Sequence, residues 1–226
     1  MKPLERLADL VASHASLDRV LQETVELATT TIAGATDASI TIVRSDDRGE
    51  GAAFSSQTAI DVDERQYGLD QGPCLDASRG HEIFVVHDMR TDPRWPDYTQ
   101  YPVEAGILSS LSIPLPIQEE ILGALNVYSR EEGAFDDRSI EQAERFAGYA
   151  AVAIANAQLC ASAAEAAEHL RRAMESRAVI EQAKGIIMAQ RRCTAAEAFD
   201  VLVAASQREN VKLRLLAERV VGGVSR

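Results

Sequence analysis

The sequence is poor in cysteine and in long apolar runs, and each scarcity excludes a class of protein. Only three of its 226 residues are cysteine, and they are widely spaced. Neither a disulfide framework nor a zinc-site spacing is present, so a reducing compartment is expected. No apolar run approaches the about 18 residues of a membrane span, and the N-terminus lacks the apolar core of a signal peptide. The sequence therefore predicts a cytoplasmic protein without a membrane segment.

Basic residues are also scarce. The chain has 23 Lys and Arg against 35 Asp and Glu, a net charge of −12, which argues against a nucleic-acid partner because phosphate contacts need clustered cations. The charge is unevenly distributed, however. Residues 1–160 carry 12 basic and 27 acidic side chains, whereas residues 161–226 carry 11 and 8. This asymmetry predicts two domains, 1–160 and 161–226, with different partners.

Hydrophobic periodicity predicts an α+β fold for the first domain. Residues 4–33 have a helical period, and an N-cap at Ser16 leaves open whether they form one helix or two. Strand patterns, with a turn at 45–49 and short helices among them, follow at 38–43, 51–57, 82–86, 109–117 and 122–128. Consecutive strands favour an antiparallel sheet flanked by helices. Pro114 and Pro116 indicate an edge strand or a strand end.

Two helix starts are marked by single residues in this region. Pro73 suits the first position of a short helix. Asp136 suits the N-cap of a long helix that begins near Asp137.

Four segments of residues 1–160 resemble a GAF domain, a fold that senses small molecules in many bacterial regulators. They are GPCLDA at 72–77, DPRWP at 92–96, LSIPL at 111–115 and LGALNVY at 122–128, the last followed by AFDD at 134–137. The resemblance implies a sheet of about six strands with a pocket on one face for an unidentified small molecule.

Four side chains in these segments are candidates for lining that pocket: Cys74, Trp95, Asn126 and Tyr128. Cys74 lies at a predicted helix start and is favoured as a small buried side chain; the alternative is redox sensing through a lowered thiol pKa. Trp95 would either cover a pocket or pack on Pro96. Asn126 and Tyr128 suit a pocket lining or the sheet core.

No catalytic residue, metal site or cofactor is expected. His81 and His87 would share a face of a regular strand, but no third metal ligand is fixed by the pattern. The paired acidic residues lie in predicted turns or at a helix start, and no nucleophile–base arrangement follows from spacing. The sequence therefore predicts that the protein is not an enzyme.

Residues 137–192 predict a long helix, or two nearly continuous ones, because they lack proline and are rich in alanine. Apolar residues near a heptad spacing are Leu159, Ala163, Ala166, Leu170, Ala173, Ile180 and Ile187. This spacing favours a coiled-coil homodimer. The alternative is a single linker helix that lies on its own domain.

The tail predicts a small bundle of three helices. Thr194 and Glu197 have the spacing of a capping box, Asn210 suits the N-cap of a last helix, and Gly222 with Gly223 would end it. The tail resembles an ANTAR domain, the RNA-binding module of certain bacterial antiterminators. The matching residues are SR at 176–177, IEQAKGIIM at 180–188, AEAF at 196–199, Leu202, Ser206 and Asn210. The resemblance implies binding to hairpin loops in nascent RNA; Leu215 departs from its pattern.

The candidate RNA-binding residues are Arg177, Gln182, Lys184, Gly185, Arg191, Lys212 and Arg214. Arg177 and Lys184 are seven residues apart and share a helix face, with Gln182 and Arg191 off it. Gly185 costs ~1 kcal/mol inside a helix, which makes sense if a helix or an RNA loop approaches its backbone. Phe199, the one aromatic residue of this tail, is assigned to the core.

Two other functions fit the tail. The segments 194–206 and 211–221 have helix-turn-helix spacing and would suit a DNA-binding transcription factor, although the last helix offers no Asn or Gln for reading bases. The tail could instead serve only to dimerise a sensor or scaffold. We favour a signal-responsive RNA-binding antitermination regulator.

Overall fold

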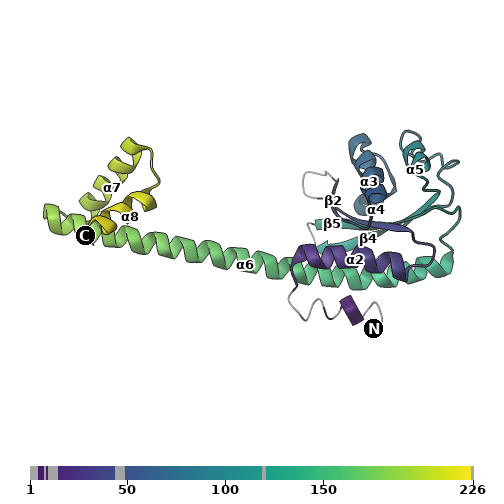
Figure 1. The fold of residues 1–226 in the computed structure, drawn as a ribbon, viewed down its shortest axis with the longest axis horizontal. Coiled ribbons are helices and arrows are strands. Elements are labelled where there is room, and N and C mark those ends of the chain that lie inside the picture. Colours follow the sequence, from purple (N-terminus) through teal and green to yellow (C-terminus); the bar gives the residue numbers. More distant parts are fainter. Residues whose placement is uncertain (1–4, 8, 10–14, 44–48, 119–120, 225–226) are drawn as a thin grey trace. The chain divides into compact units, whose positions relative to one another are not determined.

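The computed structural model describes residues 5–7, 9, 15–43, 49–118 and 121–224 (Figure 1). Contacts between Cα atoms divide the chain into two compact units, Met1–Ala161 and Ser162–Arg226. Each unit has its own apolar core.

The first unit is built on a five-stranded antiparallel sheet. Its strands are β1 (Asp37–Val43), β2 (Gly49–Phe54), β3 (Phe84–Val86), β4 (Ser109–Gln118) and β5 (Ile121–Ser129). The strand order is β2-β1-β5-β4-β3, and every neighbouring pair is antiparallel. The predicted α+β class with an antiparallel sheet is confirmed, with five strands in the described residues. Residues 44–48, which include most of the predicted turn, lie outside the described part.

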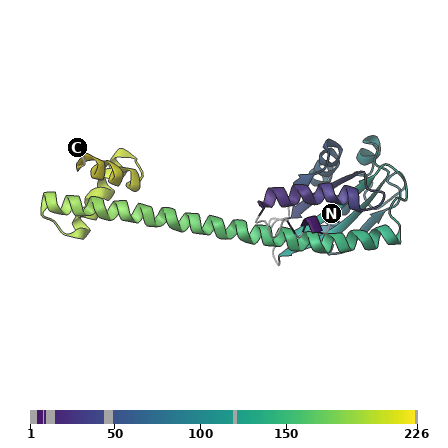
Figure 2. The same ribbon diagram turned by 60° about the horizontal axis from the view of Figure 1, so that its bottom comes forward.

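Helices cover both faces of this sheet (Figures 1 and 2). Helix α2 (Leu17–Thr31) and the first part of α6 (Asp137–Arg191) lie on one face, and α3 (Gln57–Leu69), α4 (Pro73–Gly80) and α5 (Gln100–Glu104) lie on the other. Successive residues of a strand point to opposite faces of the sheet, so alternate side chains lie under different helices. Ile40 and Leu125 thus enter the main apolar core with Phe146 of α6.

The predicted helix starts are confirmed in this unit. The Ser16 hydroxyl accepts from the Arg19 N–H at 3.4 Å, so α2 begins at Leu17. Residues 10–14 lie outside the described residues, so the question of one helix or two is not decided there. Pro73 stands in the first turn of α4. Asp136 caps α6, since its carboxylate accepts from the Ser139 N–H at 2.8 Å.

The prediction of an edge strand at Pro114 is correct for only part of β4. That strand lies between β5 and β3. However, β3 has three residues and pairs only with Ser110, Leu111 and Ser112. Pro114 lies beyond the end of β3 and pairs with Ala124 of β5 alone. A residue that cannot donate a backbone hydrogen bond is tolerated at such a position.

The second unit contains the end of α6, α7 (Ala195–Glu209) and α8 (Leu213–Val224). Its core is small and consists of Ala183, Ile187, Ala198, Leu202, Leu216 and Ala217. The capping box of Thr194 and Glu197 is confirmed, with both reciprocal hydrogen bonds present.

Two helix boundaries in this unit differ from the prediction. Asn210 does not begin the last helix. It ends α7 in the left-handed conformation (φ 50°), which asparagine tolerates better than most residues. Gly222 and Gly223 do not stop α8, which continues to Val224. Neither glycine has a positive φ, so their conformational freedom is not used to end the helix.

Helix α6 runs without interruption for 55 residues, which settles the choice between one helix and two. The sequence contains no long uninterrupted apolar run. By length and mean composition, however, part of α6 is long and apolar enough to span a membrane. About 39% of that segment is buried inside the protein. Core helices of soluble proteins pass the same test, so this property is weak evidence for a membrane span.

Candidate functional site

The sheet face under α3 and α4 is lined with polar side chains. Ser39, Asn126 and Ser112 are cross-strand neighbours on β1, β5 and β4, and all three are fully buried. The Asn126 amide donates to the Ser39 hydroxyl at 3.1 Å and to the Thr41 hydroxyl at 2.9 Å. A polar row across three strands is unusual for a sheet face that is closed to water, because each polar atom there needs a partner.

The buried carboxylate of Asp63, on α3, lies on the same side of the sheet as this polar row. Asp63 accepts hydrogen bonds from the Tyr128 hydroxyl, from the Gln66 amide at 3.3 Å and from the Tyr67 hydroxyl at 3.3 Å. No ion pair of the described residues includes Asp63. Burial raises the pKa of Asp63 from 3.8 to about 6, although the hydrogen bonds act in the opposite direction. This carboxyl group is therefore protonated more readily than an exposed aspartate.

Four polar atoms on this side of the sheet have no hydrogen-bond partner within the described residues. They are the hydroxyl oxygens of Ser110, Ser112 and Tyr98 and the amide oxygen of Asn126. Ser110 lies opposite Tyr128, and Ser112 lies opposite Asn126. Each buried polar atom without a partner costs about 1–3 kcal/mol. Three hydroxyls and one carbonyl oxygen on this side of the sheet are therefore left with unused hydrogen-bonding capacity.

Apolar side chains surround these polar atoms. Val86, Met89, Trp95 and Ile107 pack with Tyr98 and Tyr128 in a second apolar cluster of the unit. A mostly apolar wall with a few converging polar groups is the usual composition of a small-molecule site.

The second unit presents basic side chains on α6. Arg177 and Lys184 are seven residues apart, as predicted. Arg191 is again seven residues beyond Lys184, and because α6 continues to Arg191 all three share one helix face. The prediction that Arg191 lies off this face is therefore wrong.

Lys184 is not a free surface cation. Its side chain is only 15% exposed, and its ammonium group contacts both carboxylate oxygens of Glu181 at 2.9 Å. The same ammonium group lies 6.0 Å from the ring centroid of Phe199 on α7. Lys184 is thereby held between a carboxylate on its own helix and an aromatic ring on the next.

A family model for the GAF domain matches residues 14–155. The chain belongs to the GAF domain family. A second model, for the ANTAR domain, matches residues 168–221. The predicted arrangement of an N-terminal GAF domain and a C-terminal ANTAR domain is confirmed. The ANTAR domain implies an RNA-binding antitermination regulator, and the GAF domain implies a sensor.

Solved structures support the GAF fold. A GAF domain from a phosphoenolpyruvate-protein phosphotransferase of Coxiella burnetii is 19% identical, with a TM-score of 0.54 over 71% of this chain and 95% of that one. The phycoerythrobilin-bound GAF domain of a cyanobacterial phytochrome is 19% identical, with a TM-score of 0.52 over 70% and 95%. Free methionine-R-sulfoxide reductase from Neisseria meningitidis is 16% identical, with a TM-score of 0.54 over 69% and 88%. These similarities establish the fold alone. No curated protein matches the chain.

The structure brings the four predicted pocket residues to the α3 and α4 side of the GAF sheet. Asn126 and Tyr128 project from β5, Cys74 lies in the first turn of α4, and Trp95 follows β3 in the connection to α5. All four are buried. Burial raises the pKa of the Cys74 thiol well above its usual value, which agrees with the favoured interpretation of a small buried side chain and argues against redox sensing. Desolvation outweighs the helix terminus at this position.

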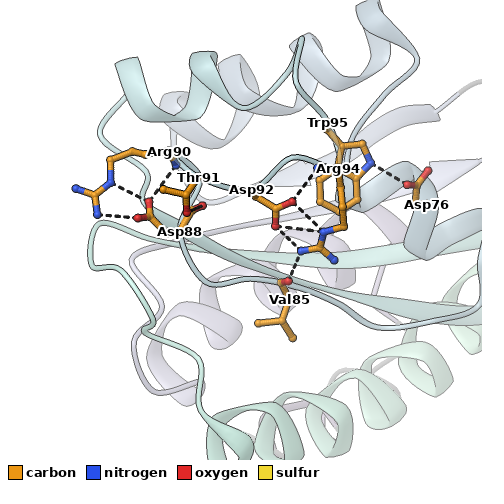
Figure 3. A network of polar contacts seen from close by, with 8 residues as sticks. All are labelled: Asp76, Val85, Asp88, Arg90, Thr91, Asp92, Arg94 and Trp95. Atoms are coloured by element: carbon orange, nitrogen blue, oxygen red, sulfur yellow. Dashed lines mark hydrogen bonds and ion pairs between the residues drawn. The ribbon is translucent and has the colours of Figure 1, made fainter.

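Trp95 is fixed by contacts on several sides (Figure 3). Its indole N–H donates to Asp76 on α4 at 2.8 Å, and its ring meets that of Phe84 edge-on with centroids 5.8 Å apart. The Arg94 guanidinium lies 4.6 Å from the Trp95 ring centroid and donates to the Val85 carbonyl at 2.6 Å. The Trp95 indole thus links the segment that follows β3 to α4 and to β3 itself.

The two histidines do not form a site. His81 ends α4 with a φ of 55°, whereas His87 is an exposed residue after β3. They are therefore not neighbours on one face of a strand. Among the described residues no cluster of His, Cys, Asp and Glu could hold a metal ion.

The ANTAR candidates fall into two groups. Arg177, Gln182, Lys184, Gly185 and Arg191 lie on α6, and Lys212 and Arg214 lie at the start of α8. No hydrogen bond or ion pair of the described residues joins the groups; Arg214 instead pairs with Glu218 at 2.8 Å. A side chain added at Gly185 would meet nothing within 4 Å. Within the described chain, the space where a Gly185 side chain would begin is therefore unoccupied.

Several important residues were missed by sequence reasoning. Asp63, Gln66 and Tyr98 were not singled out, because α3 reads as a polar segment and nothing in its pattern marks the carboxylate that is buried. Phe199 was assigned to the core, but it is 40% exposed and lies outside the ANTAR core. Its contact with Lys184 depends on the turn between α6 and α7, which local periodicity does not describe.

Proposed function

We propose that this protein is a cytoplasmic, non-enzymatic regulator that binds hairpin loops in nascent RNA and promotes antitermination under the control of its GAF domain. The main support for this proposal is the match of residues 168–221 to the ANTAR domain. The positive excess of the chain lies in the same segment, although the whole protein is acidic. Arg177, Gln182 and Arg191 are exposed on α6, where they are available for phosphate and base contacts.

A homodimer is part of the proposal. The most exposed large apolar side chains of α6 are Tyr149, Val152, Leu159, Leu170 and Met174, each more than half exposed. Tyr149, Val152, Leu159 and Leu170 follow the alternating three- and four-residue spacing of a coiled-coil seam. Asn156 occupies a position of that seam and would favour one register. A second copy would bury this surface, and two linked ANTAR domains would bind paired hairpins with raised effective concentration.

The GAF domain supplies the signal in this proposal. Its unpaired atoms at Ser110, Ser112, Asn126 and Tyr98 support binding of a small molecule between the sheet and α3–α4. Cys74, Trp95, Asn126 and Tyr128, all buried, are the proposed lining of that site. Binding would change the arrangement of α6 in the dimer and thereby the affinity for RNA. Native mass spectrometry of freshly purified full-length protein tests for such a ligand.

The RNA-binding function is tested by a gel shift with paired RNA hairpins at moderate salt. Arg177→Ala combined with Lys184→Ala should weaken binding about ten-fold, because the exposed cation of Arg177 is lost together with the paired lysine on the same helix face. Arg145→Ala removes an exposed cation from the same helix outside the ANTAR domain and should leave affinity unchanged. Unchanged affinity in the double variant would contradict the proposed face. Stronger competition by duplex DNA than by hairpin RNA would favour a DNA-binding factor instead.

A further inference from the structure

Phe199 is an exposed aromatic side chain on the second turn of α7. Its neighbour Ala198 and the later residue Leu202 are buried in the ANTAR core, whereas the Phe199 side chain lies outside that core and is 40% exposed. A single exposed apolar residue needs no explanation by itself. The surroundings of this ring distinguish it.

The Phe199 ring lies beside a charged group that is fixed in place. The Lys184 ammonium lies over the ring at 6.0 Å from its centroid and is anchored by both oxygens of Glu181. A cation at this distance is attracted to the ring face. The pair with Glu181 partly neutralises Lys184, so this lysine is better suited to hold the ring than to bind a phosphate.

Two residues of α6, Gly185 and Arg191, favour the access of RNA to the surface around Lys184 and Phe199. Gly185, next to Lys184, has no atom within 4 Å of the place where a side chain would begin. Arg191 shares the helix face of Lys184 and is exposed, so it offers a cation for a phosphate on that face. A flat ring beside a positive charge is complementary to a nucleobase with its flanking phosphates.

We propose that Phe199 is a stacking platform for one unpaired base of an RNA loop, and that Lys184 positions the ring. This inference rests on the proposed RNA-binding function. It assigns Phe199 a direct contact with RNA and Lys184 an indirect one. Unpaired loop bases are commonly recognised by stacking on aromatic side chains, because every base has a flat face.

The experiment begins with RNA hairpin pairs with randomised loops, enriched for binding to the wild-type full-length protein. Failure to enrich any RNA would overturn the proposed function and this inference with it. With an enriched RNA, Phe199→Leu should lower affinity about ten-fold, while Phe199→Trp should retain it. The Leu variant should keep the wild-type dependence of affinity on salt, since no phosphate contact is lost.

A base-by-base test locates the stacked nucleotide. RNAs with one abasic loop position at a time should include one to which the wild-type protein and Phe199→Leu bind equally. If Phe199→Leu binds the intact RNA as well as the wild-type protein does, or loses affinity equally for every abasic RNA, the proposal is wrong. A dimer mass lost on the same substitution would show that the ring contacts a second copy, which also overturns the proposal.

A matched control separates stacking from general loss of apolar surface. Leu215 on α8 is 48% exposed and has no ring, so Leu215→Ala should leave affinity unchanged. An equal loss of affinity in Leu215→Ala would contradict a role specific to the ring. Helical content and thermal unfolding of each variant should match the wild-type protein, because neither side chain belongs to the ANTAR core.

Discussion

The Tyr128 hydroxyl on β5 donates a hydrogen bond to the buried carboxylate of Asp63 on α3. This contact joins the sheet to the helix that covers it, at the centre of the polar face of the GAF domain. Gln66, which also donates to Asp63, accepts from the Cys74 N–H at 3.0 Å. One buried carboxyl group thus lies at the junction of α3, α4 and the sheet.

Asp63→Asn should make the protein more stable relative to wild type as pH rises from about 4 to about 6. Burial raises the native pKa of Asp63 from 3.8 to about 6. Between these values the folded wild type holds a proton that the unfolded chain releases, so the free energy of unfolding falls with rising pH. The neutral amide has no such titration. The difference between variant and wild type should grow by ~2 kcal/mol over this range and level off about one pH unit above the native pKa, as measured by urea unfolding.

The control for Asp63 is an exposed carboxylate on the same helix. Asp61 contacts Gln57 on α3 and is exposed. Asp61→Asn changes an exposed side chain and should alter the free energy of unfolding by no more than about 0.5 kcal/mol. A pH-independent effect of Asp63→Asn would mean that this carboxyl is not desolvated in the folded protein.

Two serines beside Asn126 should respond oppositely to replacement by alanine. The Ser39 hydroxyl accepts from Asn126, so Ser39→Ala should lower the free energy of unfolding by about 1–2 kcal/mol. The Ser112 hydroxyl is buried and has no hydrogen-bond partner among the described residues, so Ser112→Ala should leave the ligand-free protein equally stable or more stable. Thermal and urea unfolding of both variants provide the comparison. A similar loss in both would show that the Ser112 hydroxyl also has a partner.

Leu159→Glu should weaken homodimerisation by about 100-fold or more. The substitution would place an unpaired carboxylate in the seam of each helix, where burial of a charge is costly. Ala161→Glu changes an exposed position two residues away that is off the heptad seam and should have little effect. Sedimentation equilibrium of the full-length chain measures both. Equal dimerisation of Leu159→Glu and wild type would remove α6 as the dimer contact.

Thiol labelling should be confined to the accessible cysteines. Cys160 is exposed, whereas Cys74 is fully buried and has a raised pKa. A thiol-alkylating reagent at pH 8 should therefore modify Cys160 rapidly and Cys74 only after unfolding, because the thiolate is the reactive form. Mass mapping of wild type and Cys160→Ser identifies the modified residue. Rapid labelling of Cys74 in the native protein would instead support a redox-sensing role for this cysteine.

The order of domains, the sequence of helices and strands and most helix starts could be predicted from the sequence. Ser16, Pro73, Asp136 and the Thr194–Glu197 capping box act on backbone groups within a few residues, so their effect is visible locally. Asn210 shows the limit of such reasoning, because the same side chain suits either end of a helix. In the structure Asn210 lies at the C-terminal end of α7.

The sequence by itself determined that an acidic α+β domain is followed by a helical domain with a basic excess, because charge and periodicity are properties of neighbouring residues. Only the tertiary structure decided which polar groups are buried together. Asp63 and Tyr128 are 65 residues apart in the chain, and their contact depends on how α3 packs on β5. The exposure of Phe199 likewise depends on the turn that brings α7 against Lys184. Desolvation and contact between distant residues arise only when the elements pack.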